Sequence, residues 1–345
     1  MKKFDVVIGN PPYQEDAQGN ATNQMPIYHL FMDAAFEVGK KAVLITPARF
    51  LFDAGYTPKV WNAKMLSDRH LSVPIYVPNS DKLFPGTDIK GGVAVSYRDD
   101  SKTIGPIVKF MKYPELATID SKVADQRGAS MIEEGITNDR VFRYSHTMHE
   151  EYPDLSSAMS AGNHYKIDSR AFSRLHQVFF VDRPDDGHDY LCVLGLDEDK
   201  KRAFRWIRKD FVAGPEVLYR FKVALPKASG SGVFGETLAP PLILGPGMAV
   251  TGTFITVGSF STVMQAEACL KYIKTKFSRA MLGMKKVTQD NLARVWAHVP
   301  TQDFTSRSDV DWSKSIAEID QQLYAKYNLS ADEIEFIEEH VQPMS

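Results

Sequence analysis

The sequence predicts an α/β fold over its first hundred residues, followed by a mixed α+β region and a helical C-terminus. Two observations predict this fold class. In the first hundred residues, short apolar and β-branched runs alternate with segments whose apolar residues recur at helical spacing, which is typical of a parallel sheet covered by helices. Beyond about residue 105 the strand-like runs follow one another irregularly, and helical spacing returns only after residue 265.

The individual elements follow from these runs in chain order. The run "FDVVI" at residues 4–8 predicts a first strand covered on both faces, and "PIYHLFMDAAFEVG" predicts a helix that ends at Gly39. Ser330 and Glu333 predict a capping box for the last helix. The other expected elements are a strand, loop and helix within residues 41–52, strands at residues 72–80 and 93–99, mixed strands at residues 190–197, 216–225 and 252–260, and a helix at residues 265–282.

The length and these patterns predict three parts. A chain of 345 residues with 43% hydrophobic residues can bury a large core and exceeds the usual size of a single domain. We therefore expect an α/β part in residues 1–105, a mixed part in residues 106–305 and a helical C-terminal segment in residues 306–345.

The composition argues against several classes of protein. The two cysteines, Cys192 and Cys269, are too few and too isolated for a disulfide framework or a zinc site, so no metal site is expected. No apolar run reaches transmembrane length, and the N-terminus begins with a strand instead of a signal peptide. We expect a cytoplasmic protein that does not enter a membrane.

The formal net charge of −2 conceals an uneven distribution of charge. Residues 200–210 and 271–286 are strongly basic, whereas the chain after Asp303 is rich in Asp and Glu. Local charge decides which partner a surface attracts. The basic runs are candidate contacts for nucleic acid, and a solvated surface is the alternative interpretation.

A stiff polar loop follows the first predicted strand. Asn10, Pro11, Pro12 and Tyr13 cannot continue a strand, because the prolines lack backbone donors and fix φ. In open α/β sheets, ligands bind beyond the carboxyl ends of the strands. The loop is therefore a candidate site for chemistry. The alternative is that the prolines only end the strand and that Tyr13 packs beneath it.

The segment "DVVIGNPPY" resembles the catalytic motif of amino-group methyltransferases that use S-adenosylmethionine (SAM), which include DNA adenine-N6 methyltransferases and the glutamine methyltransferases of release factors. The resemblance implies that the first part is the second half of a SAM-dependent methyltransferase (Rossmann-like) sheet. It assigns Asn10, Pro11, Pro12 and Tyr13 to the catalytic motif. The adenine amine is a poor nucleophile because its lone pair is delocalised. If the Asn10 side-chain carbonyl and the Pro11 backbone carbonyl accept hydrogen bonds from the amine, that lone pair turns toward the SAM methyl. The resemblance also implies that Tyr13 stacks on the flipped base.

A second motif narrows the family. The segment "NSDKLFPGTDIKGGVAVSY" resembles the later motif of type II restriction-modification enzymes that carry methylase and specificity region in one chain. The resemblance implies that Phe84 stacks on the flipped adenine opposite Tyr13, with a place in the core as the alternative, and that Lys90 contacts a phosphate. The chain after residue 105 resembles the DNA target-recognition domain of that family and its helical C-terminus. We expect double-stranded DNA to be the partner and to contact Lys274, Lys276, Arg279, Lys285 and Lys286.

In that family, a glycine-rich loop and an acidic residue that hold SAM precede the catalytic motif, and this sequence has neither before Asn10. We therefore expect the catalytic-motif and recognition portion of a DNA adenine-N6 methyltransferase that is inactive alone. A second polypeptide supplying the SAM-binding half, or a truncated gene product, explains the difference. The principal alternative is a non-enzymatic DNA-binding specificity module or subunit-interaction protein. A methyltransferase that acts on RNA or protein amines is a third class.

Overall fold

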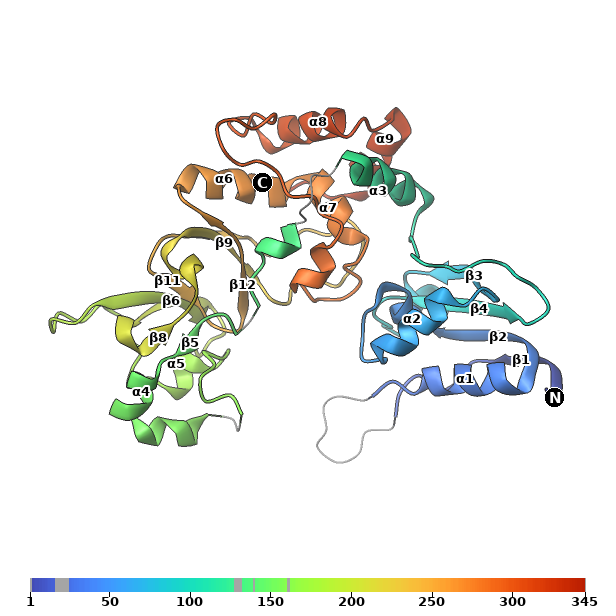
Figure 1. The fold of residues 1–345 in the computed structure, drawn as a ribbon, viewed down its shortest axis with the longest axis horizontal. Coiled ribbons are helices and arrows are strands. Elements are labelled where there is room, and N and C mark those ends of the chain that lie inside the picture. The colour runs from blue at the N-terminus through green and yellow to red at the C-terminus, as the bar shows by residue number, and fades with distance from the viewer. Residues whose placement is uncertain (1, 16–24, 127–131, 139, 160–161, 345) are drawn as a thin grey trace. The chain divides into compact units, whose positions relative to one another are not determined.

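A computed structural model describes residues 2–15, 25–126, 132–138, 140–159 and 162–344. The chain divides into two compact units (Figure 1). Unit 1 comprises Met1–Ala117 with Ser231–Val233, and unit 2 comprises Thr118–Gly230 with Phe234–Ser345. We describe each unit by itself.

Unit 1 contains a four-stranded sheet with the order β1-β2-β4-β3. Strand β1 (Phe4–Gly9) runs parallel to β2 (Gly39–Pro47), whereas β4 (Val93–Asp99) is antiparallel to both β2 and β3 (Leu71–Val77). All four strands lie where the apolar runs of the sequence predict them. Because β4 alone is reversed, the carboxyl ends of β1, β2 and β3 meet at one edge of the sheet.

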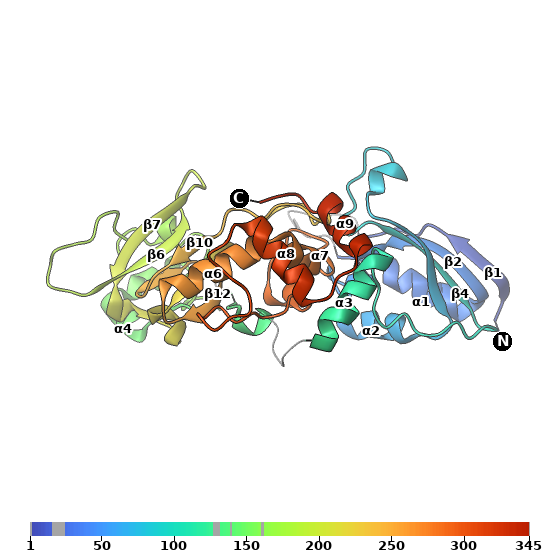
Figure 2. The same ribbon diagram turned by 90° about the horizontal axis from the view of Figure 1, so that it is seen from above.

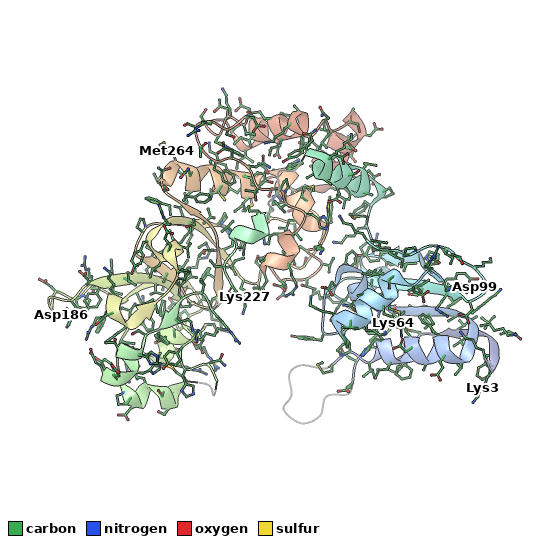
Figure 3. All side chains as sticks on the ribbon, viewed as in Figure 1. Lys3, Lys64, Asp99, Asp186, Lys227 and Met264 are labelled. Carbon is green, nitrogen blue, oxygen red and sulfur yellow. The ribbon has the colours of Figure 1, made fainter. Side chains whose placement is uncertain are left out.

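Two helices cover one face of this sheet. Helix α1 (Tyr28–Val38) packs on β2 and β1, and α2 (Lys59–Ser67) follows a 3₁₀ turn, η1 (Ala48–Phe52). Rings of Tyr28, Phe50 and Trp61 contact one another and join the three elements. Asp33 of α1 accepts hydrogen bonds from the Trp61 indole and from Lys64, which is labelled in Figure 3. The helices therefore form one layer on the side of the buried residues of β2.

The other face of the sheet is largely bare within the described residues, and this corrects the expectation that the first strand is covered on both faces. Val6 is 49% exposed and Ile8 77% exposed, and Ile75 on β3 is 53% exposed. The pairing of Ile8 with Val43 places these side chains opposite the helix layer. The alternation of burial along β2 agrees, because Ala42 and Leu44 are buried while Val43 is only half-buried.

Unit 2 is a mixed α+β structure with three small sheets in its described part. Their strand orders are β10-β9-β12, β11-β6-β7 and β5-β8. Residues 216–219 form a 3₁₀ turn, η6, and not the start of a strand as the sequence predicts. The strands are β5 (Arg143–Tyr144), β6 (Tyr190–Leu196), β7 (Arg202–Arg208), β8 (Val212–Ala213), β9 (Phe221–Pro226), β10 (Leu242–Leu244), β11 (Met248–Val250) and β12 (Phe254–Phe260).

The C-terminal helices of unit 2 pack together around α7, as Figures 1 and 2 show from two directions. The predicted helix at residues 265–282 is two helices, because the Thr275 side chain caps a new helix and Asp320 accepts hydrogen bonds from the first two amides after it. The capping box of Ser330 and Glu333 is confirmed. The helices after β4 are α3 (Pro114–Gln126), which begins in unit 1, and α4 (His146–Glu151), α5 (Ala171–Arg174), α6 (Val263–Lys274), α7 (Lys276–Gly283), α8 (Ile316–Lys326) and α9 (Ala331–His340) of unit 2.

In the part of the chain that the structure describes, no helix is both long enough and apolar enough to span a bilayer.

Candidate active site

A pocket of about 320 Å³ lies in unit 1 at the carboxyl edge of the sheet. Its walls come from the loop after β1, from the segment after β2 and from the loop after β3. Such an edge is where open α/β sheets bind their ligands. The polar and aromatic residues that line it are Tyr13, Gln14, Tyr28, Arg49, Tyr56, Thr57, Thr87 and Asp88.

The loop after β1 places Tyr13 in this pocket. The Tyr13 carbonyl accepts a hydrogen bond from the Ile27 amide at 3.2 Å, and the Glu15 amide donates to Met25 at 2.9 Å, so the loop is anchored just before α1. The Tyr13 side chain is half-buried, and burial raises the pKa of its hydroxyl. Among the described residues that buried hydroxyl has no hydrogen-bond partner.

The remaining residues of the loop lie beside the pocket. Asn10 and Pro12 are exposed and Pro11 is half-buried. They do not line the cavity itself. They follow β1 directly, so the stiff loop holds them at the same sheet edge as Tyr13.

The loop after β3 is braced by one buried side chain. The Ser80 hydroxyl donates to the Thr87 carbonyl at 2.9 Å and accepts from the Ile89 amide at 2.8 Å, and the Phe84 amide donates to the Ser80 carbonyl at 2.7 Å. Thr87 and Ile89 line the pocket. Phe84 is half-buried on the same loop and does not line it. Side chains of this loop therefore reach the pocket, and Phe84 lies beside it.

Arg49 is a pocket residue that the sequence analysis missed. It lies in the first turn after β2, and its Nε donates to the Lys90 carbonyl at 2.6 Å. Its aliphatic stem runs past Gly55 and Gly91, which both have positive φ. The signal in the sequence was an arginine two residues beyond the end of a predicted parallel strand, where such sheets bind ligands.

Lys90 itself is engaged within the loop. Its ammonium pairs with the Asp88 carboxylate at 2.6 Å. Asp88 is also the only carboxylate among the described residues that line the pocket. That carboxylate already pairs with a cation. The described residues that line the pocket include no other acidic group for a ribose, and Gly55 is their one glycine. These residues do not by themselves fit SAM.

The basic run after residue 271 is placed differently from the expectation. Arg279 is 2% exposed and donates to the carbonyl oxygens of Lys274, Glu236 and Gln342. Lys286 is 4% exposed and donates to Glu236, Ser229 and Thr288. Burial of both side chains among their own chain's acceptors corrects the prediction that they contact DNA.

The other three lysines of the run lie closer to the surface. Lys276 is half-buried and pairs with Glu338 at 2.6 Å. Lys274 and Lys285 are half-buried. A DNA contact stays a prediction for these three side chains.

Metal-binding residues do not gather anywhere in the described ranges. No group of three or more His, Cys, Asp or Glu side chains is placed to hold an ion within them. Cys192 and Cys269 are both buried free thiols, and burial raises the pKa of each. Neither is a candidate nucleophile, because a thiolate is disfavoured in both places.

The fold and the site define an α/β unit with a pocket at the carboxyl edge of its sheet. One protein-family model matches this part of the chain. Residues 1–84 match the model of the Eco57I restriction-modification methylase family. The matched range contains the four residues of the loop after β1 and extends to Phe84.

Comparisons over the whole chain give weaker similarities than the family comparison. Among curated proteins, none is significantly similar in sequence. Among solved structures, the type IIG restriction endonuclease BpuSI is similar with 11% identity and a TM-score of 0.35, over 97% of this chain and 53% of that one. The chain thus spans about half the length of that enzyme.

Proposed function

We propose that this chain is the catalytic-motif and DNA-recognition portion of a site-specific DNA adenine-N6 methyltransferase from a restriction-modification system. The main support is that Tyr13 of the Asn-Pro-Pro-Tyr loop lines a pocket at the carboxyl edge of the unit 1 sheet. The family match of residues 1–84 supports the same class. In this proposal unit 2 recognises the DNA sequence.

The residues of unit 1 would orient the target amine. The Asn10 side-chain carbonyl and the Pro11 backbone carbonyl each accept a hydrogen bond from one N–H of the target amine. The nitrogen therefore becomes pyramidal and its lone pair points outward. Tyr13 stacks on the flipped adenine, with Phe84 proposed for the opposite face. When bound, SAM supplies the methyl group.

Arg49 would hold the target strand. Its Nε is occupied by the Lys90 carbonyl, and its guanidinium is fixed beside the pocket that contains Tyr13. A guanidinium that is held in one orientation is well suited to a phosphate oxygen. We assign it to a phosphate next to the flipped nucleotide.

A partner chain would supply the SAM-binding half. Strand β1 pairs only with β2 among the described strands, which leaves its other side without a neighbour. The bare face that includes Val6, Ile8 and Ile75 exposes apolar surface as well. Exposed edges and apolar faces of this kind are usually covered in the functional assembly, and further strands with their helices would cover both. In this proposal the chain alone is inactive.

The test compares the chain alone with the chain co-expressed with the product of the adjacent upstream reading frame. Tritiated-methyl transfer to duplex DNA, followed by mass spectrometry of the nucleosides, should detect N6-methyladenine only in the combined sample. Calorimetry should detect no tight SAM binding to the chain alone.

The other outcomes identify the alternatives. DNA binding without methyl transfer in either sample would favour a non-enzymatic specificity or subunit-interaction module. Methyl transfer to RNA or protein in preference to DNA would overturn the assignment of substrate.

A further inference from the structure

The pocket of unit 1 has a wall that the proposed contacts of the target adenine do not use. Of the residues that the proposed function gives to that adenine, only Tyr13 lines the cavity. The unused wall comes from the turn between η1 and α2, whose residues Ala54, Gly55, Tyr56 and Thr57 all line it. This turn has no role in the reaction described so far.

The turn is braced at both ends and presents Tyr56 to the pocket. At one end it packs on the stem of Arg49, since a Cβ at Gly55 would lie 3.1 Å from the Arg49 Cδ. At the other end the Thr57 hydroxyl donates to the Asn62 side-chain carbonyl of α2 at 2.8 Å. Tyr56 is therefore held in a turn that is fixed to the elements on either side of it.

The ring of Tyr56 is accessible to a ligand. Its side chain is 61% exposed and lines the cavity together with Arg49. Single exposed aromatic residues are common on protein surfaces, so exposure alone assigns no role. Tyr56 differs because it lies in a cavity wall whose next element carries a guanidinium that is anchored through its Nε.

A ring and a guanidinium in one cavity suit a nucleotide of a DNA strand. Bases stack on aromatic rings with little dependence on sequence, because every base has a π-face. Extrusion of a target base leaves the adjoining base of the same strand without its stacking neighbour on one side. A protein ring that covers this open face recovers part of the lost stacking energy, and Arg49 is already assigned to the phosphate beside the flipped nucleotide.

We propose that Tyr56 stacks on the base that adjoins the target adenine in the same strand, with Arg49 at the phosphate between the two nucleotides. The inference rests on the proposed function, because it requires a target base that is extruded at Tyr13. The pocket then serves two neighbouring nucleotides, and only one of them is methylated. Because stacking does not distinguish the bases by hydrogen bonds, each of the four bases fits at Tyr56.

The first experiment measures the fluorescence of 2-aminopurine in a duplex bound to the chain co-expressed with the upstream gene product. The probe is placed at the target position or on either side of it. Unstacked 2-aminopurine is brighter than stacked 2-aminopurine, so Tyr56→Ala should brighten the probe on one side only and leave the target probe unchanged. Tyr56→Phe keeps the ring and should behave as the wild type. Brightening on both sides, or on neither, would overturn the proposal.

Val60→Ala is the matched control for a local effect on the fold. Val60 is 84% exposed, lies on α2 four residues after Tyr56 and does not line the pocket. It should change none of the probes. Tyr56→Ala and Val60→Ala should both keep the thermal unfolding midpoint of the wild type, because substitutions of exposed side chains seldom change stability.

The second experiment tests whether the partner of the Tyr56 ring is a base. Tyr56→Ala should weaken binding of the target duplex by about 5- to 150-fold, which corresponds to the loss of one stacked base. On a duplex that is abasic at the adjoining position found above, the same substitution should have no effect. A loss that persists on the abasic duplex would mean that the ring contacts another group, and the proposal would be wrong.

The two hypotheses can fail separately. If the wild-type protein leaves the fluorescence of the target probe unchanged, the base is not extruded, and the proposed function fails together with this inference. If the target probe responds and Tyr13→Ala suppresses that response, while Tyr56→Ala changes neither adjoining probe, the pocket serves the target base alone and the proposed function stands.

Discussion

The Nε atom of Arg49 donates a hydrogen bond to the Lys90 carbonyl oxygen at 2.6 Å, across 41 residues of sequence. This bond ties the turn after β2 to the loop after β3, and both segments line the pocket of unit 1. The geometry of the pocket therefore depends on how closely the aliphatic stem of Arg49 approaches the loop after β3.

Asn10→Ala should abolish methyl transfer in the completed enzyme and leave duplex affinity nearly unchanged. The change removes an acceptor that acts mainly in the transition state and few ground-state contacts. A tritiated-methyl assay and an anisotropy titration on the same preparation measure the two effects. Near-normal turnover of the variant would exclude the proposed role of Asn10.

Tyr13→Ala should weaken capture of the flipped base by about 1 to 3 kcal/mol, the usual contribution of one base stack. Tyr13→Phe is the matched control, because it keeps the ring and removes a hydroxyl that has no partner among the described residues. Fluorescence of 2-aminopurine at the target position reports extrusion of the base. An equal effect of both substitutions would mean that the hydroxyl, and not the ring, matters.

Gly91→Ala should reduce both stability and target-base capture. A Cβ at Gly91 would lie 2.9 Å from the Arg49 Cγ, at a φ of +85° that disfavours side chains. Gly86→Ala is the control, since its φ of +79° is similar and nothing lies within 4 Å of the added atom. Both variants should lose about 1 to 2 kcal/mol to backbone strain, and only Gly91→Ala should change 2-aminopurine fluorescence. Identical fluorescence in the two variants would contradict a role for the Arg49 position.

Lys286→Met should lower the free energy of unfolding by about 1 to 3 kcal/mol, because it removes the buried ammonium that pairs with half-buried Glu236 and donates to the carbonyls of Ser229 and Thr288. The neighbouring Lys285→Met should change it by less than about 0.5 kcal/mol, since that side chain is only half-buried. Chemical denaturation measures both. A folded Lys286→Met protein with normal stability and a lower salt slope for DNA would restore the DNA-contact role.

Lys222 should make the stability of unit 2 depend on alkaline pH. Its side chain is 0% exposed, its ammonium donates to the carbonyls of Leu218, Arg220 and Gly245, and burial lowers its pKa to about 8. An unfolded lysine has a pKa of about 10.4. Between these values the unfolded chain binds more protons, so the free energy of unfolding should rise with pH from about 8 to about 10.4 and level off below and above this window.

Lys222→Met is the variant that tests this dependence. It should remove the alkaline rise and lower stability at every pH, by about 1 to 3 kcal/mol for each carbonyl left without a partner. Denaturant titrations at pH 7.5, 9 and 10.5 measure both effects. A variant that keeps the same rise would show that another group is responsible.

Much of unit 1 could be predicted from local pattern. Runs such as residues 4–8 and 93–99 are short, apolar and β-branched, and such runs form strands in most surroundings. The capping box of Ser330 and Glu333 was equally predictable, because both partners lie within one helical turn. The break at Thr275 was not, since Asp320 of another helix accepts the hydrogen bonds that begin α7.

The candidate site likewise contains some residues that could be predicted from the local sequence and others that could not. The Asn10 to Tyr13 loop was identifiable because two prolines after a strand are a local signal. Arg49 had a weaker local signal, its position two residues beyond a predicted strand, because its place in the pocket also depends on Gly91 and Lys90, which lie about forty residues further along the chain.

The sequence by itself determined the elements of unit 1, the stiff loop after β1 and the uneven distribution of charge, because each depends on residues close together in the chain. Only the tertiary structure decided which cations of the basic run are buried. Arg279 and Lys286 are buried among carbonyl and carboxylate oxygens, whereas Lys274, Lys276 and Lys285 of the same run are only half-buried. The physical reason is that charge is a property of a residue, while burial depends on the segments that pack against it.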